Sequence, residues 1–235
     1  MGVKLVIFTL MLGLIGAMFT SPDEWLEKGF NIRDGIFEEP SDYNLKIETK
    51  CNEVNLSKSG SPYNYNGTVL SGYLKVGKGN SALTFIFYGK ENVAKDKLKT
   101  IPTVLWLNGG PGSSSQLGNL MELGPFWLVK PNGFKPYDVV RNNFTWTKDY
   151  NILFVDQPVG TGLSYADPTF PNVYVKNMTD LATDFYNALK ELYQNPSGCF
   201  SKINIKGSDP LIIFGESYAG KYAPAIGLKI LTEAK

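Results

Sequence analysis

The chain has 235 residues, of which 43% are hydrophobic, 13% aromatic and 19% charged. This composition is typical of a globular protein with a substantial core, and the length suits one domain or part of a larger one. A formal net charge of +1 gives no reason to expect nucleic acid or an anionic membrane surface as a partner. Histidine is absent and the two cysteines lie far apart in sequence, which argues against a metal site. We expect no cofactor.

Residues 1–20 have the pattern of a secretory signal peptide. Lys4 gives a positive start, and residues 5–19 are apolar apart from one threonine and two glycines. The stretch is shorter than the roughly 20 residues that a membrane span needs. We therefore predict that it is removed and that the mature chain has no stable membrane association. An uncleaved anchor is the alternative.

Four Asn-x-Ser/Thr sequons follow the signal, at Asn55, Asn66, Asn143 and Asn177. Each is weak alone, but together with the signal they indicate a glycoprotein of the secretory pathway, either vacuolar, lysosomal or extracellular. Cys51 and Cys199 are suited to one disulfide in that oxidising compartment. A free thiol, or a partner cysteine outside this chain, is equally compatible with the sequence.

The first half of the mature chain begins with a polar segment. Residues 21–64 show no sustained hydrophobic period, and we expect loops and short turns there. Residues 69–76 and 82–88 are predicted strands, joined by a glycine-containing hairpin over 77–80. Residues 91–99 mix acidic and basic side chains with apolar ones, which indicates a solvated connector.

Three apolar runs come next, at 101–107, 152–155 and 211–214. Runs without alternation are typical of strands covered by helices on both faces, as in a parallel sheet. Residues 177–194 carry apolar side chains at three- to four-residue spacing and are predicted to form an amphipathic helix, and a further helical stretch runs from Tyr218. Strands that alternate with helices favour an α/β fold.

The last apolar run leads into Gly-Glu-Ser-Tyr-Ala-Gly at 215–220. A serine at a sharp junction between strand and helix is the nucleophile elbow of α/β-hydrolases, where only small residues fit beside it. Here the pattern is G-x-S-x-A, a mild departure from G-x-S-x-G. The turn would hold the Ser217 hydroxyl clear of the sheet, and a plain serine in a turn is the alternative.

Three sequence blocks together are more specific than the elbow alone. Residues 106–115 (WLNGGPGSSS), 154–165 (FVDQPVGTGLSY) and 215–220 (GESYAG) resemble the signature blocks of the serine carboxypeptidases, in the family's order. The resemblance begins near Tyr65 and continues to Lys235. It implies an α/β-hydrolase fold with a mostly parallel sheet and flanking helices. Family members are longer, so residues 21–235 resemble the N-terminal part of the domain, truncated after the elbow and its helix.

The resemblance assigns roles to the residues that would take part in acyl transfer. Ser217 corresponds to the nucleophile that forms an acyl-enzyme. The backbone N–H groups of Gly110 and Tyr218 correspond to the oxyanion hole, which binds the negative oxygen that develops in acyl transfer. The family's triad Asp and His lie after the elbow. Asp156 precedes Ser217, and we interpret it as structural support for the loop at 160–164.

The resemblance also implies a site for the terminal carboxylate of a peptide or protein substrate. Asn108, Gly109 and Glu216 match the residues that hold this carboxylate, and Glu122 matches a second Glu that hydrogen-bonds the first. Two carboxyl groups in contact do not both ionise easily, so one pKa rises and peptides bind best at acidic pH. Glu122 as an ordinary surface residue is the alternative. Trp106 is predicted to pack beside this site, with a simple core role as the alternative.

Two positions depart from the family pattern. Ser113 stands where most members have a cysteine, so a disulfide that braces this loop is absent, and Leu163 replaces a usual aromatic. Three functions remain open: a serine carboxypeptidase, a related acyltransferase or esterase, and a non-catalytic secreted glycoprotein. Without a histidine we expect the 235-residue chain to be inert. We also expect it to be poorly soluble, because residues 211–214 would form an uncovered edge strand.

Overall fold

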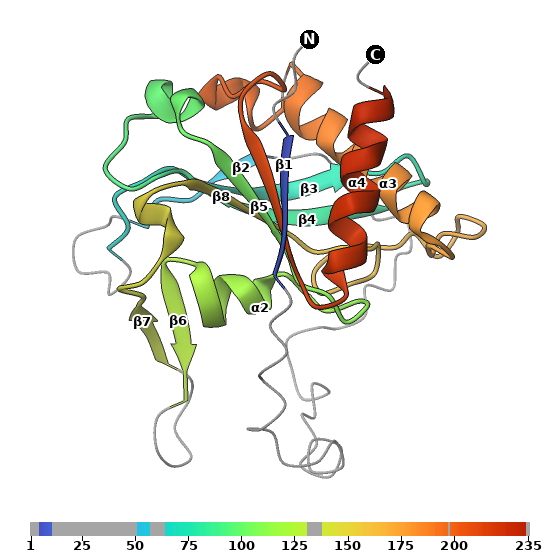
Figure 1. Ribbon diagram of the computed structural model, residues 1–235, viewed down its shortest axis with the longest axis horizontal. Helices are drawn as coiled ribbons and strands as arrows, with labels where there is room; N and C mark the ends of the chain where they lie inside the picture. Colours follow the sequence, from blue (N-terminus) through green and yellow to red (C-terminus); the bar gives the residue numbers. More distant parts are fainter. Residues whose placement is uncertain (1–4, 11–50, 57–63, 131–137, 197, 234–235) are drawn as a thin grey trace.

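The protein is described by a computed structural model that covers residues 5–10, 51–56, 64–130, 138–196 and 198–233 (Figure 1). A seven-stranded sheet runs through it in the order β1-β9-β5-β8-β4-β3-β2. Its strands are β1 (Leu5–Leu10), β2 (Cys51–Glu53), β3 (Val69–Lys75), β4 (Ala82–Tyr88), β5 (Thr103–Leu107), β8 (Asn151–Val155) and β9 (Leu211–Glu216). β1, β9, β5 and β8 are parallel, whereas β4, β3 and β2 are added antiparallel at the other edge.

Two long helices cover one face of this sheet. α3 (Met178–Gln194) packs on β3 and β4, and α4 (Ala219–Glu233) packs on β1, β5 and β9. The helices also contact each other and lie side by side in Figure 1. The side chain of Asn177 caps α3 by accepting a hydrogen bond from the Asp180 N–H at 2.9 Å. In the part of the chain that is described, no helix has the length and apolar character needed to cross a membrane.

Shorter elements complete the described part of the fold. They are η1 (Lys95–Thr100), α2 (Gln116–Gly118), the π-helical turn η2 (Asn119–Leu123), β6 (Phe126–Val129), β7 (Asp138–Arg141), η3 (Trp146–Lys148) and η4 (Ser201–Ile203). β6 and β7 form an antiparallel ribbon that is separate from the main sheet and projects at the lower left of Figure 1. β6 contacts η2 directly, which places the ribbon close to the C-terminal end of α2 and η2.

The predicted strands and helices between residues 69 and 233 are confirmed within a few residues. The prediction that residues 211–214 are covered on both faces is wrong. Leu211 and Ile213 are buried under α4, but Ile212 and Phe214 on the other face are only partly buried. They line a hollow of about 560 Å³ together with Val104 and Trp146. Among the described residues, that face of β9 is covered only in part, by side chains that include Trp146, and an apolar run alone does not reveal this.

Three further expectations need correction. Within 21–64, which was expected to form loops, residues 51–53 pair with β3 as β2, while 21–50 and 57–63 lie outside the described residues. The connector at 91–99 is not fully solvated, since Leu98 is buried. Residues 211–214 do not form an open edge, because β1 pairs with β9 in parallel over six residues. This strand lies inside the segment predicted to be a signal peptide, and the argument for poor solubility loses its physical basis while β1 is present.

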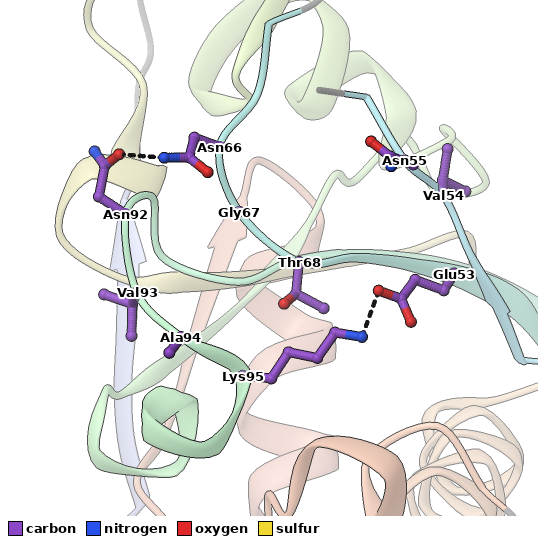
Figure 2. Close-up of a pocket in the computed structure, with 10 residues that line it drawn as sticks. All are labelled: Glu53, Val54, Asn55, Asn66, Gly67, Thr68, Asn92, Val93, Ala94 and Lys95. Carbon is purple, nitrogen blue, oxygen red and sulfur yellow. Dashed lines mark hydrogen bonds and ion pairs between the residues drawn. The ribbon is translucent and has the colours of Figure 1, made fainter. Parts of the chain in front are cut away.

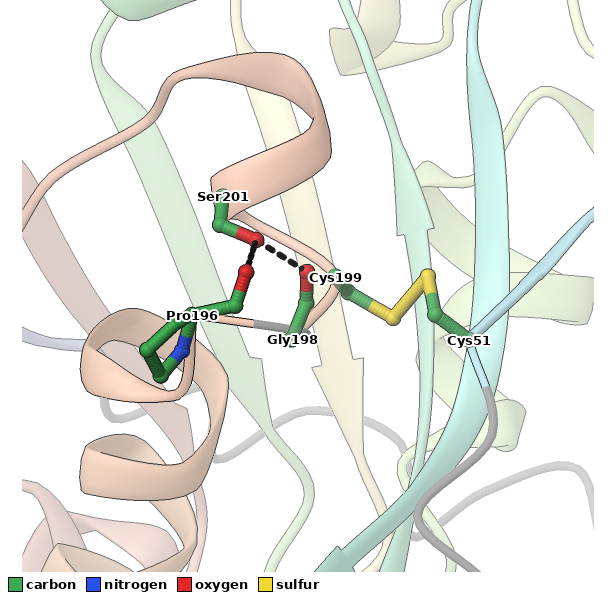
Figure 3. Close-up of a disulfide and its surroundings, with 5 residues drawn as sticks. All are labelled: Cys51, Pro196, Gly198, Cys199 and Ser201. Atoms are coloured by element: carbon green, nitrogen blue, oxygen red, sulfur yellow. Dashed lines mark hydrogen bonds between the residues drawn. A yellow bond between two sulfur atoms is a disulfide. The ribbon is translucent and has the colours of Figure 1, made fainter.

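A disulfide connects the antiparallel edge of the sheet to the segment after α3. Cys51 on β2 is bonded to Cys199, with 5.2 Å between the two Cα atoms (Figure 3). Beside it, the Ser201 hydroxyl donates to the carbonyls of Pro196 and Gly198, at 2.8 and 2.7 Å. These contacts fix the turn that presents Cys199, so the structure selects the paired state among the alternatives that the sequence left open.

Candidate active site

The junction between β9 and α4 has the geometry of a nucleophile elbow. Ser217 lies between the end of β9 and the start of α4, with a φ of 55° and an exposed side chain. A positive φ is strained for a residue other than glycine and is often found at functional sites. At Gly215 a Cβ atom would come within 2.6 Å of the Ala219 carbonyl oxygen, so only glycine fits there. The sharp turn predicted at Ser217 is therefore present.

The glycine-rich loop after β5 lies directly against this elbow. A Cβ atom at Gly109 would come within 2.4 Å of the Tyr218 nitrogen and 2.7 Å of the Glu216 carbonyl oxygen. Gly110, the next residue, is exposed and has a φ of 103°. Among the described residues, the backbone N–H groups of Gly110 and Tyr218 have no hydrogen-bond partner. Both N–H groups predicted to form the oxyanion hole are thus on adjoining backbone segments.

Asn108 joins the loop to the elbow through its side chain. The Asn108 Nδ2 donates to Glu216 Oε2 at 2.6 Å. Its Oδ1 accepts from Trp106 Nε1 and from the Gly118 N–H, each at 3.0 Å. Asn108 is buried, so these three bonds fix which way its amide points. Trp106 thus contacts Asn108, as predicted, and it also belongs to a buried core cluster, which was the alternative.

Glu122 completes a cluster of three polar side chains with Asn108 and Glu216. Burial raises the pKa of Glu122, and the nearby Glu216 charge raises it further, while a hydrogen bond with the Asn108 side chain opposes the rise. Glu122 is half-buried rather than exposed, so the alternative of an ordinary surface residue is not what the structure shows. At acidic pH a protonated carboxyl in this cluster becomes a hydrogen-bond donor.

Asp156 braces two loops that border the site. Its side chain is fully buried and accepts from the Ser114 hydroxyl at 2.7 Å, from Gln116 Nε2 at 3.4 Å and from the Leu163 N–H at 3.0 Å. Each carboxylate oxygen therefore holds a different loop. The interpretation of Asp156 as structural support for residues 160–164 is confirmed.

Tyr222 is a supporting residue that the sequence analysis missed. Its hydroxyl accepts from the Gly112 N–H at 3.3 Å, and its ring contacts Tyr218 edge to face at 5.3 Å. Tyr222 thus connects the first turn of α4 to the glycine-rich loop, which has Ser113 in place of the family's cysteine. An aromatic residue one turn into the helix that follows the elbow is the signal that could have found it.

Comparison with known proteins agrees with this geometry. A family model described as serine carboxypeptidase matches residues 60–235. The chain belongs to the serine carboxypeptidase family. The probable serine carboxypeptidase CPVL of Homo sapiens is 40% identical over 157 residues, which cover 66% of this chain and 29% of the relative. The pheromone-processing carboxypeptidase KEX1 of Metarhizium robertsii is 38% identical over 165 residues, which cover 70% of this chain and 24% of the relative.

A solved carboxypeptidase shares the fold. The crystal structure of KEX1(DELTA)P, a prohormone-processing carboxypeptidase from Saccharomyces cerevisiae, matches with a TM-score of 0.60 and 26% sequence identity. The match covers 77% of this chain and 37% of that chain. The fold is therefore that of the α/β-hydrolases. The chain spans about a quarter to a third of the length of the curated relatives it matches.

The asparagines of the four predicted glycosylation sites all have exposed side chains in this serine carboxypeptidase fold. Asn55 and Asn66 line a polar cavity of about 480 Å³ beside the loop at 92–95 (Figure 2). Asn66 Nδ2 donates there to Asn92 Oδ1 at 2.8 Å. This cavity lies near the end of β4 that pairs with the start of β8, whereas Ser217 follows the opposite, C-terminal end of the parallel strands.

Proposed function

We propose that the chain carries the nucleophile and the terminal-carboxylate site of a serine carboxypeptidase. The observation that carries this proposal is the Asn108–Glu216 hydrogen bond of 2.6 Å, one residue before the exposed Ser217. A peptide carboxylate held by Asn108, Gly109 and Glu216 would bring the last peptide bond to the serine. Cleavage there releases the C-terminal residue, which is the reaction in the names of the family's curated relatives.

The chemistry would proceed through an acyl-enzyme on Ser217. The hydroxyl oxygen attacks the carbonyl carbon of the last peptide bond, and the N–H groups of Gly110 and Tyr218 stabilise the oxyanion. The bond to the departing amine then breaks, and water later hydrolyses the ester. These steps need a base for the serine proton, and the 235 residues contain no histidine. We propose that these residues alone bind peptides but do not turn them over.

The absence of histidine from the 235 residues also suggests a second candidate function. A secreted glycoprotein that binds peptide termini without cleaving them needs the carboxyl cluster but no general base. The lack of histidine favours this function for the chain as given, whereas a longer form with a suitable base would be a carboxypeptidase. The same serine could serve an acyltransferase or esterase, since fold does not fix function.

Peptide binding tests the carboxylate site without requiring turnover. An N-acetylated tetrapeptide with a free C-terminal carboxylate and its C-terminal amide are titrated against the full chain near pH 5 and followed by amide chemical shifts. We expect the amide to bind at least about tenfold more weakly, which corresponds to roughly 1.4 kcal/mol. Glu216→Gln should extend binding to higher pH, because an amide donates without needing a proton. Equal affinities for acid and amide would overturn the proposed site.

Labelling with a fluorophosphonate tests the state of the serine. Such probes react with an activated serine, and without a base we expect no stoichiometric labelling of the full chain. Ser217→Ala gives the background signal. Stoichiometric labelling at Ser217 would show that a base other than histidine acts on it, and it would refute the proposed lack of turnover.

Routing through the secretory pathway, to a vacuole, a lysosome or the exterior, is part of the proposal. Expression in a eukaryotic secretory host should yield a protein that begins after residue 20 and loses mass on treatment with an N-glycanase. Exposure of Asn55, Asn66, Asn143 and Asn177 supports glycan attachment. A product that stays in the cytosol without glycans would refute both the signal and the sequon assignments.

A further inference from the structure

The last turn of η2, which carries Glu122, is held by hydrogen bonds from the β6–β7 ribbon and the segment after it. Four successive carbonyl groups, at residues 122–125, accept these bonds. Helix ends leave such carbonyls without partners inside the helix, so they need donors from elsewhere. Here the donors include the side chains of Trp127, Arg141, Asn142 and Thr145.

Asn142 makes the central contacts of this set. Its Nδ2 donates to the Glu122 carbonyl at 2.9 Å and to the Gly124 carbonyl at 2.8 Å. Its Oδ1 accepts from the Phe144 N–H at 2.8 Å, and its own backbone N–H donates to the Pro125 carbonyl at 3.0 Å. The side chain is fully buried. A buried amide with three bonds of this kind has a single orientation, so it defines the position of the backbone it touches.

The Glu122 carbonyl receives a second bond from the same region. Trp127 Nε1 donates to it at 2.9 Å, and the Trp127 ring stacks on Phe144. The backbone of Glu122 is thus held from two directions. Its carboxyl interacts with the Asn108 side chain, on the loop after β5, and with Glu216 on β9.

Among the described residues, Glu216 is the charged group whose electrostatic interaction shifts the pKa of the Glu122 carboxyl. Arg141 on β7 is the nearby cation, but it forms an ion pair with Glu91 and stands over the rings of Tyr65 and Phe126. Within the described part of the chain, no opposite charge holds Glu122 in the cluster. Its place there depends on its hydrogen bond with the Asn108 side chain and on the position of its own backbone.

We propose that Asn142 is a positioning residue, which fixes the backbone of Glu122 so that its carboxyl stays against Asn108 and Glu216. The ribbon β6–β7 and the segment after it then form part of the terminal-carboxylate site without touching the substrate. That Asn142 supports peptide binding in this way rests on the proposed function. That Asn142 positions the Glu122 carboxyl does not depend on that function.

Asn151 provides a matched control. It is also fully buried, its Nδ2 donates to the carbonyls of Leu98 and Ile101 at 2.9 and 3.0 Å, and its Oδ1 accepts from the Lys90 N–H at 2.9 Å. It lies at the start of β8, at the opposite end of that strand from Asp156. Asn142→Ala and Asn151→Ala therefore remove the same kinds of contact and introduce no charge.

The experiment measures the titration midpoint of Glu122 by NMR in the full chain with ¹³C-labelled glutamate. If Asn142 positions Glu122, Asn142→Ala lets the carboxyl move into water and away from Glu216, and its midpoint falls by about 0.5 pH unit or more. Asn151→Ala leaves it unchanged. A folded Asn142→Ala chain with an unaltered Glu122 midpoint would overturn the proposal, as would an equal shift in both variants.

Trp127→Phe keeps the inference testable if Asn142→Ala does not fold. This change removes the indole N–H donor and retains an aromatic ring against Phe144. A smaller downward shift of the Glu122 midpoint supports positioning from the ribbon, and an unchanged midpoint refutes it. Because the readout is a titration, it stands apart from peptide affinity. Failure of the proposed carboxylate site would appear as equal binding of acid and amide with the Glu122 shift intact.

Discussion

The carboxyl cluster of Asn108, Glu122 and Glu216 lies beside the turn that carries Ser217, and the two are supported very differently. In the cluster, each polar side chain is at least half-buried and has a partner from another part of the chain. Ser217 is exposed, and the 235 residues contain no histidine to act as its base. In the proposed function the cluster recognises the peptide terminus and Ser217 reacts with it, so changes in each part test recognition and reaction separately.

The largest effect should come from a change that disrupts both parts. Gly109→Ala would place a methyl group 2.4 Å from the Tyr218 nitrogen. The nearest atoms are all backbone atoms of the elbow, so no flexible side chain can move aside to make room. Overpacking of this kind costs about 3 kcal/mol in the free energy of unfolding, measured by urea titration. Gly207→Ala is the control, because nothing lies within 4 Å of a Cβ atom there. If both variants were equally stable, the close contact between loop and elbow would be disproved.

A smaller effect, confined to the cluster, is expected from Asn108→Asp. The new side chain still accepts from Trp106 and Gly118, but it no longer donates to Glu216 and places a second negative charge beside it. The added negative charge repels the anionic terminus of the free-acid peptide, so the affinity for this peptide should fall more than about tenfold. Affinity for the amide should change little. An unchanged preference for the acid would place the carboxylate site elsewhere.

The pH dependence of the free energy of unfolding tests whether Glu122 is part of the cluster with Asn108 and Glu216. Burial and Glu216 raise the pKa of Glu122, so ionisation of this group is less favourable in the folded chain than in the unfolded one. Its contribution to stability is therefore lost as pH rises from the ordinary glutamate range through the raised pKa. Glu122→Gln should lessen the loss of stability between about pH 4 and pH 7, measured by urea unfolding.

Glu233 offers a control of opposite sign for that measurement. A hydrogen bond from Lys229 lowers the pKa of Glu233, so its contribution is lost as pH falls rather than as it rises. Glu233→Gln should thus change the slope slightly in the other direction. If Glu122→Gln and the parent chain showed the same slope, Glu122 would be titrating normally and the cluster would not be as described.

The smallest effect on recognition is expected from Ser217→Ala. The serine is exposed, and alanine retains the backbone N–H groups beside it. Binding of the free-acid peptide should stay within about twofold of the parent chain, whereas any reaction with a fluorophosphonate should disappear. A large loss of affinity would mean that the hydroxyl takes part in ligand binding, and that the two parts of the site are not separable.

The positions of β3, β4, β5, β8 and β9 along the chain, and the elbow, could be predicted from sequence because they depend on local patterns. β5, β8 and β9 are apolar runs, and the small residues around Ser217 are those that a sharp turn requires. The β6–β7 ribbon was not predicted because its strands have only four residues each, and β7 mixes charged with apolar side chains. The Asn142–Glu122 contact joins residues 20 positions apart, and nothing in the local sequence marks that pair. Coverage of β9 by β1 depends on pairing between segments that are distant in sequence.

The disulfide also determines the covalent topology of the site. Bonding Cys51 to Cys199, 148 positions apart, closes a ring of chain that includes Asn108, Glu122 and Asn142 but leaves Glu216 and Ser217 on a tail outside it. One peptide-bond cut within the ring leaves all residues in a single molecule until the disulfide is reduced. A cut between Cys199 and Glu216 instead yields a separate piece that carries the serine and is held to the ring by non-covalent contacts, which include β9 pairing, α4 packing and the Asn108–Glu216 hydrogen bond. Limited proteolysis followed by gel electrophoresis with and without reductant would tell these cases apart.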